Sequence, residues 1–188
     1  NIKSDYGDIT LFLSNNLTAK MLGQYLTAND IDAFYANDDI NKLIDDSLHA
    51  GAIFISIDSA LYPSQLISDL KKSAPPILSI KGNIDLLTET SVGFCGSRKA
   101  SPAGIEVAMD CAEQLAQKNI ATISGYAAGI DQAAHFSTLH ANGKTIIVLP
   151  EGILNFKIRA TLKHILNRKN TLIISQFSPN SNWSVKNA

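Results

Sequence analysis

The stretch GFCGSRKASPAG, residues 93–104, joins an apolar run to a helical segment through glycines, a serine and a basic pair. Gly96 lets the backbone turn and approach a ligand, and Ser101-Pro102 is a typical helix start. The N–H groups of a helix start, the Ser97 hydroxyl and the Arg98 guanidinium together suit a phosphate. Because the dinucleotide pattern GxGxxG is absent, the corner alone leaves phosphate binding and mere packing equally open.

Outward from this corner, apolar runs alternate with helical patterns as far as residue 175. The runs predict strands over 91–95, 120–124, 145–149 and 171–175, with helices over 102–118, 130–142 and 154–168 between them. Such alternation indicates an open, mostly parallel sheet of the extended Rossmann type with helices on both faces. Ligands bind such sheets outside the carboxyl ends of the strands, where the corner at Arg98 lies.

The front of the chain has a different character. Helical spacing over 17–26 and 40–48 predicts a small helical unit, residues 1–51, before the α/β domain of residues 52–188. Residues 1–90 carry 12 acidic and 6 basic side chains, whereas residues 91–188 carry 5 acidic and 10 basic. The basic half is therefore the one suited to an anionic partner.

Composition excludes several classes of protein. With 188 residues, 45% hydrophobic and 18% charged, the chain can bury a globular core, and no apolar run approaches the ~20 residues of a membrane-spanning helix. The polar opening NIKSDYGD is not a signal peptide, so we expect a cytoplasmic protein. No His, Cys or carboxylate cluster has ligand spacing, and we expect neither a metal nor a cofactor.

A second glycine corner, SGYAAGIDQAAH at residues 124–135, ends one strand at Gly125 and opens a helix at Gly129. Asp131 lies in the first helical turn, and His135 follows four residues later on the same face. An acid/base pair is one reading. We favour a structural role, because no nucleophile or second carboxylate is near in the sequence.

A third corner, residues 149–169, is rich in cations. On the predicted helix Arg159 and Lys163 would face the same way, and Phe156 would offer a stacking surface beside Lys157. A basic helix is most often only a solvated face. Because it follows the same kind of strand end as Arg98, both could border one cleft.

The three corners together resemble the DNA processing protein A family (DprA, also called Smf). The resemblance rests on GSRKASPAG, ISGYAAGIDQAAH and TIIVLPEGI, with ALYPSQL, PPILSIKGNIDLL and SQFSPNSNW in the family's order, and covers about residues 53–188. It implies a non-catalytic protein that binds single-stranded DNA, protects incoming strands and helps load a RecA-type recombinase in natural transformation. It also implies a homodimer, and a chain that is truncated at its C-terminal end.

The resemblance also assigns site residues. The family's Gly-Ser-Arg motif falls on residues 96–98, and its second glycine motif shapes the same pocket. Where members have a Gly-rich turn with Tyr-Pro and Asn, this chain reads PEGILNFKIR, so basic residues there would substitute. We therefore expect DNA phosphates at Gly96, Ser97, Arg98, Lys99, Gly125, Gly129, Lys157 and Arg159, with Asp131 and His135 shaping the pocket.

Two alternatives use the same strand ends. Nucleotide-cleaving enzymes of the LOG type resemble the chain in fold, but their Pro-Gly-Gly-x-Gly-Thr motif is absent, and PEGI gives Glu151 no evident partner. A nucleotide-binding sensor would hold a small ligand in the same pocket, and the sequence leaves this class open.

Overall fold

The computed structural model describes residues 38–187, so the helical pattern over 17–26 lies outside the described residues. The chain divides into two compact units between Phe54 and Ile55. Of the first unit the structure describes helix α4, Asp38–His49, after which Gly51 takes a φ of 79°, the left-handed conformation that commonly ends helices. The helical unit expected over 1–51 thus stays a prediction.

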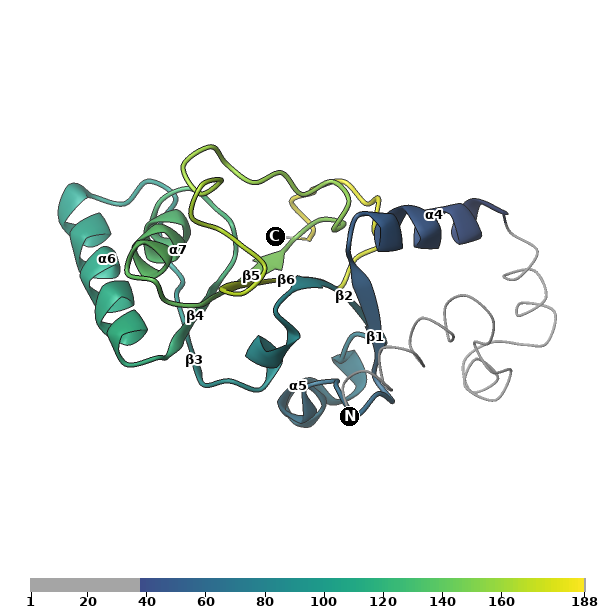
Figure 1. The fold of residues 1–188 in the computed structure, drawn as a ribbon. Coiled ribbons are helices and arrows are strands. Elements are labelled where there is room, and N and C mark those ends of the chain that lie inside the picture. The colour runs from purple at the N-terminus through teal and green to yellow at the C-terminus, as the bar shows by residue number, and fades with distance from the viewer. Residues whose placement is uncertain (1–37, 188) are drawn as a thin grey trace. The chain divides into compact units, whose positions relative to one another are not determined.

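Six strands form one mixed sheet in the order β1-β2-β6-β5-β4-β3. The run from β6 to β3 is parallel, and β2 pairs antiparallel with β6. The predicted α/β sheet is therefore confirmed (Figure 1). The strands are β1 (Ile53–Ser56), β2 (Ile77–Gly82), β3 (Ser91–Gly93), β4 (Ala121–Ser124), β5 (Thr145–Leu149) and β6 (Thr171–Ser175).

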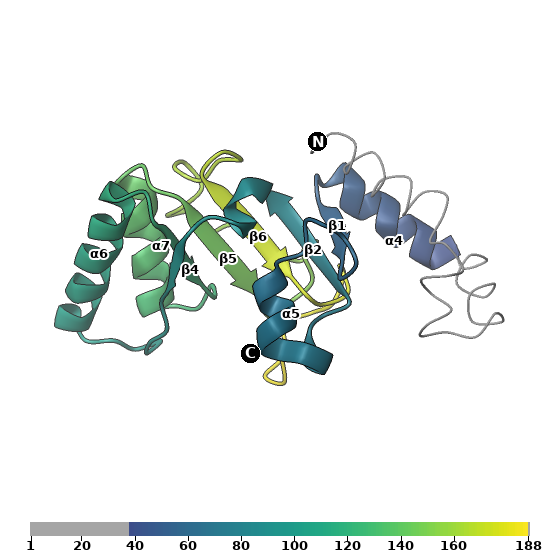
Figure 2. The same ribbon diagram turned by 90° about the horizontal axis from the view of Figure 1, so that it is seen from below.

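Helices α6 (Pro102–Gln117) and α7 (Ile130–His140) cover one face of the sheet, while α5 (Ser64–Leu70) lies on the other (Figures 1 and 2). Ala108, Ala112 and Ala116 recur every four residues on the buried face of α6, and such small side chains let α7 approach closely. No helix within residues 38–187 is long and apolar enough to cross a membrane. The 3₁₀ helices are Lys71–Ser73 and Ile84–Leu87.

The helix predicted over 154–168 is wrong, because this segment is a succession of turns. Some of its backbone N–H groups make isolated turn bonds, and two bond to distant partners, so no continuous helical ladder forms. The Leu154 N–H donates to the Pro179 carbonyl at 2.9 Å, and the Arg159 N–H donates to the Tyr126 hydroxyl at 2.9 Å. Tertiary contacts therefore override the helical spacing of the apolar residues.

It follows that Arg159 and Lys163 share no helix face. The segment still covers the sheet beside α7, since Gln132 donates to the Thr161 hydroxyl at 3.2 Å and Leu162 is fully buried. A parallel crossover that usually holds a helix is here a loop with an apolar anchor.

Candidate nucleic-acid interface

A cavity of about 980 Å³ opens at the carboxyl ends of β4, β5 and β6. Its lining mixes cations, carboxylates, amides and aromatic rings. Of the residues predicted from the sequence it includes Arg98, Gly125, Asp131, Lys157 and Arg159. The cations of the first and third corners thus border one space, as parallel strand ends require.

The loop after β3 borders this cavity through Arg98. The backbone N–H groups of Gly96, Ser97 and Arg98 bond to no other described residue, and the exposed Arg98 side chain forms no ion pair within residues 38–187. The Ser97 hydroxyl accepts the Lys99 N–H at 3.0 Å, which fixes the turn. Successive free N–H groups beside a guanidinium are what a phosphate needs.

The start of α6 contributes less to anion binding than the sequence suggested. The Ser101 hydroxyl accepts the Gly104 N–H at 3.2 Å, the Ser101 carbonyl accepts the Ile105 N–H at 3.0 Å, and Pro102 has no N–H. Most donors of the first turn are therefore satisfied by the helix's own cap. The free donors lie in the loop before it.

Gly96 and Gly129 allow the first and second corners to approach closely, because neither residue has a Cβ. Gly129 has a φ of 85°, and a Cβ there would collide with the Ser97 carbonyl oxygen. A Cβ at Gly96 would collide in turn with the Ile130 side chain, and the Ile130 N–H donates to the Ser97 carbonyl at 3.3 Å. Neither Gly96 nor Gly129 lines the cavity, so both position Arg98 from behind.

His135 is buried and supports the second corner. Its Nε2–H donates to the Gly125 carbonyl at 2.6 Å, since a carbonyl can only accept. Burial lowers the pKa of the imidazole. Its Nδ1 lies 2.6 Å from the Thr145 hydroxyl oxygen, and the Thr145 hydroxyl donates to the Thr122 carbonyl at 3.1 Å. His135 therefore holds the end of β4 and has no access to a ligand.

Asp131 is also largely buried, at 9% exposure, and its Oδ2 accepts the Ala127 N–H at 3.3 Å. The carboxylate closes the loop before α7 and does not hydrogen-bond to His135. The pair assumed in an acid/base reading is absent from this geometry. The arrangement suits a pocket wall.

Arg159 reaches the cavity through a set of fixed contacts. Its guanidinium lies 4.7 Å from the centre of the Tyr126 ring, and Nη1 donates to the Ala127 carbonyl and to Gln132 Oε1 at 3.3 and 3.2 Å. Phe156 packs edge-on against Tyr126 at 4.8 Å between ring centres. Phe156 thus braces the cavity wall, and Arg159 has only its remaining N–H groups for a ligand. Lys157 is exposed.

Several cavity residues were missed from the sequence. Tyr126 directly follows β4, so its position at a strand end could have indicated it. Trp183, 46% exposed at the cavity, carried no local signal because no element surrounds it. Lys99 is exposed but lies outside the lining. The polar cavity residues that were missed in the same way are Asn155, Gln176, Asn182 and Asn187.

Residues 38–187 hold no group of three His, Cys, Asp or Glu side chains that could bind a metal.

Comparison with known proteins agrees with this architecture. DNA processing protein DprA of Streptococcus pneumoniae is 35% identical over 108 residues, which are 56% of this chain and 38% of the relative. The crystal structure of DprA from Streptococcus pneumoniae superposes with a TM-score of 0.64 and 28% identity, covering 90% of this chain and 62% of that one. DprA of Helicobacter pylori, whose structure concerns single-stranded DNA binding, has the same fold, with a TM-score of 0.57, 23% identity and coverage of 72% and 60%.

The chain spans between about a third and two thirds of the length of these proteins. The family described as DNA recombination-mediator protein A matches residues 53–188, which include the whole cavity. The resemblance seen in the glycine corners is therefore confirmed. The chain belongs to the DNA recombination-mediator protein A family.

Proposed function

We propose that residues 52–188 bind single-stranded DNA at the carboxyl ends of the parallel strands and perform no catalytic step. The observation that carries this proposal is Arg98, an exposed guanidinium without an ion pair in residues 38–187, beside three free backbone N–H groups. Membership of the DNA recombination-mediator family and the likeness in fold to a single-stranded DNA-binding relative support it.

In this proposal Arg98 and the loop N–H groups hold one phosphate, and Lys157 with the free edge of Arg159 holds a second. Lys99 adds charge outside the cavity. Trp183 offers an exposed ring on which a base can stack, a contact that tolerates any sequence. Binding is thus expected to depend strongly on salt and weakly on base sequence.

The test is a fluorescence titration of a labelled 20-nucleotide oligothymidylate with wild-type protein and Arg98→Ala at two salt concentrations. Loss of one charge-assisted phosphate contact, ~1.5 kcal/mol or more, weakens binding at least about tenfold. The slope of log affinity against log salt becomes shallower by about 0.7. Lys72→Ala, an exposed lysine outside the cavity lining, is the control. Equal affinities for Arg98→Ala and Lys72→Ala would refute the proposed site.

A nucleotide-binding role is the second candidate, because Asp131 and Glu151 place two carboxylates in the same cavity. Carboxylates repel phosphates but accept hydrogen bonds from ribose hydroxyls. The titration therefore includes a duplex and a panel of mononucleotides. Tight binding of one mononucleotide with weak binding of the oligonucleotide would favour a sensor or a LOG-like enzyme.

In the cell, the proposed role is to protect incoming single strands in the cytoplasm and help a RecA-type recombinase load onto them, as a homodimer. This role rests on the family assignment. It is tested by recombinase filament assembly on strands coated with single-strand-binding protein, with and without this chain. Sedimentation of the free chain tests the dimer.

A further inference from the structure

A second cationic surface begins at the cavity and continues along the segment between β5 and β6. Between Glu151 and the end of the sequence the chain contains six Lys or Arg residues and no acidic residue. Five of them fall in the turn segment between β5 and β6: Lys157, Arg159, Lys163, Arg168 and Lys169, here called the basic strip. Four of the five are exposed, and none forms an ion pair within residues 38–187.

The strip is held in place by its own contacts. Leu162 is fully buried and anchors its middle. At its end the Asn167 side chain accepts the Lys169 N–H at 2.9 Å, and Asn83 on the neighbouring strand connection donates to the Lys169 carbonyl at 2.9 Å. The cations therefore project from a fixed backbone, which reduces the entropy lost on binding.

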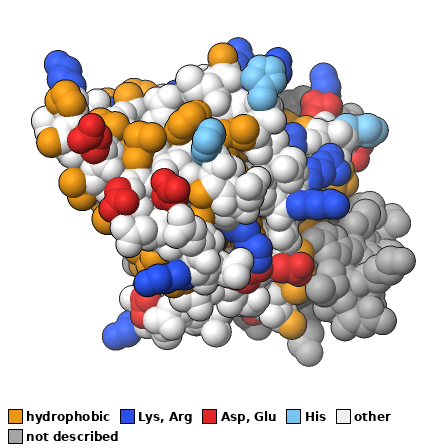
Figure 3. Space-filling view, turned by 60° about the vertical axis from the view of Figure 1, so that its left-hand side comes forward, with side chains coloured by type: hydrophobic (Ala, Val, Ile, Leu, Met, Phe, Trp, Pro, Cys, Tyr) orange, Lys and Arg blue, Asp and Glu red, His pale blue; other side chains and the backbone are white. Residues whose placement is uncertain are grey.

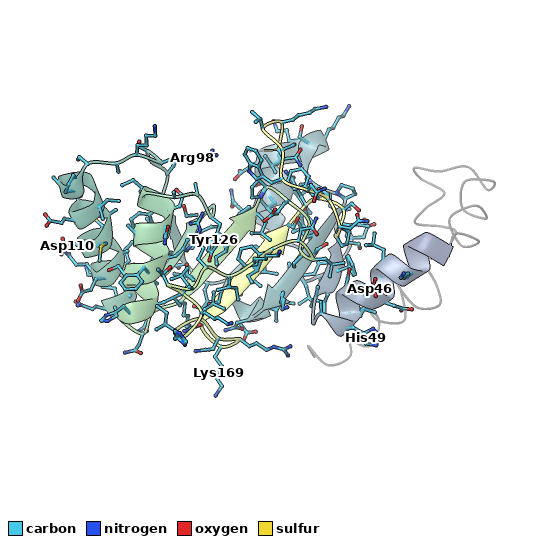
Figure 4. The ribbon with its side chains drawn as sticks, turned by 90° about the horizontal axis from the view of Figure 1, so that it is seen from above. Asp46, His49, Arg98, Asp110, Tyr126 and Lys169 are labelled. Atoms are coloured by element: carbon cyan, nitrogen blue, oxygen red, sulfur yellow. The ribbon has the colours of Figure 1, made fainter. Side chains whose placement is uncertain are left out.

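The strip runs from the carboxyl ends of the strands to their amino ends. Lys157 lines the cavity at the carboxyl ends of the strands, whereas Lys169 precedes β6 and lies at their amino ends. In Figure 4 Tyr126 lies between Arg98 and Lys169. The five residues of β6 span roughly 17 Å at about 3.3 Å each, which is the length that the strip covers between the two ends of this strand.

The surface of helix α6, which follows the Arg98 loop in the sequence, is unfavourable for a polyanion. Helix α6 exposes Glu106, Asp110 and Glu113 and contains no Lys or Arg, and acidic side chains are seen over it in Figure 3. Like charges repel the phosphates there. A single strand is therefore expected to avoid the exposed face of α6.

We propose that the basic strip is a second phosphate-binding surface, which carries a single strand from the cavity toward the amino ends of the sheet. The inference rests on the proposed function. It predicts that long strands contact Arg168 and Lys169, while an oligonucleotide of three residues occupies the cavity alone.

The experiment measures a 16-nucleotide and a 3-nucleotide oligothymidylate against Arg168→Ala/Lys169→Ala. Two lost phosphate contacts make the salt slope of the 16-mer shallower by about 1.4, so its affinity loss between 50 and 200 mM salt shrinks roughly sevenfold. Binding of the 3-mer stays unchanged. The control is Lys71→Ala/Lys72→Ala, an exposed adjacent pair in the 3₁₀ helix Lys71–Ser73, outside the cavity lining and the strip. It should leave the binding of both oligonucleotides unchanged.

The outcomes separate the strip from the cavity. If Arg168→Ala/Lys169→Ala behaves as the control pair does, or weakens the 3-mer as much as the 16-mer, the strip is not a separate surface. If polyglutamate displaces the 16-mer as well as unlabelled oligothymidylate does, the surface fits an acidic protein and the inference fails. Arg98→Ala weakens both lengths. If it weakens neither, the proposed function itself fails whatever the strip shows.

Discussion

Replacing Gly129 by alanine tests whether backbone contact between the two glycine corners positions Arg98. With a φ of 85° and a ψ of −127°, Gly129 has a conformation that side chains rarely adopt. This strain costs about 1–3 kcal/mol. The new Cβ also collides with the Ser97 carbonyl oxygen, a backbone atom that cannot turn aside as a flexible side chain does.

Together these effects predict a loss of about 2–4 kcal/mol in the free energy of unfolding, which lowers Tm by roughly 10 °C in a domain of this size. The displaced Ser97 and Arg98 should also weaken oligonucleotide binding at temperatures where the variant is folded. Thermal unfolding followed by circular dichroism measures the first effect, and fluorescence titration measures the second.

Two other glycines serve as matched controls. Gly93→Ala meets no atom within 4 Å and should leave both stability and binding within error. The atoms nearest to the new Cβ in Gly96→Ala belong to the side chain of Ile130 and not to backbone, so its effect should be intermediate. If Gly129→Ala melts and binds as Gly93→Ala does, the two corners are not held together by this contact.

Two further predictions concern buried side chains. Because burial lowers the pKa of His135, the unfolded chain binds a proton below pH ~6.5 that the folded chain resists. The contribution of His135 to stability is present above that pH and is lost as the pH falls toward the folded pKa. Urea unfolding at pH 7.5 and 5.5 should show a smaller decrease in His135→Asn than in wild type, and equal decreases would contradict this. Leu162→Ala should lower the free energy of unfolding by about 2–4 kcal/mol, because Leu162 is fully buried. A loss below 1 kcal/mol in the same assay would show that the strip is not anchored there.

The strands could be predicted because each is encoded locally. Runs such as TIIVL at 145–149 and TLIIS at 171–175 are mostly buried, and they are followed by Pro150 and Gln176. The glycine corners could be located for the same reason. Strand ends of a parallel sheet gather at one edge, so placing Arg98 and Lys157 beside one cavity needed only the order of the elements.

The segment 154–168 could not be predicted, because its conformation depends on residues distant in the sequence. A Cβ at Gly152 would collide with the backbone at Pro179, and the Asn155 side chain donates to the carbonyls of Asn180 and Ser181 at 2.8 and 3.1 Å. These contacts bend the chain away from a helix despite its apolar spacing. The role of Arg159 depends in the same way on the Tyr126 ring, 33 residues earlier.

The cations of the cavity form no ion pair within residues 38–187, because interactions other than salt bridges hold the site together. Its corners are joined by close backbone contacts at Gly129 and by hydrogen bonds of His135, while the Asp131 carboxylate is satisfied by a backbone N–H. Within residues 38–187 the one ion pair is Lys144 with Glu89, which lies away from the cavity lining. A cation neutralised by a carboxylate contributes little to phosphate binding, because the partner must first be displaced. Since Arg98 has no such partner among the described residues, its full charge is available to a ligand, and salt should weaken binding far more than it weakens the fold.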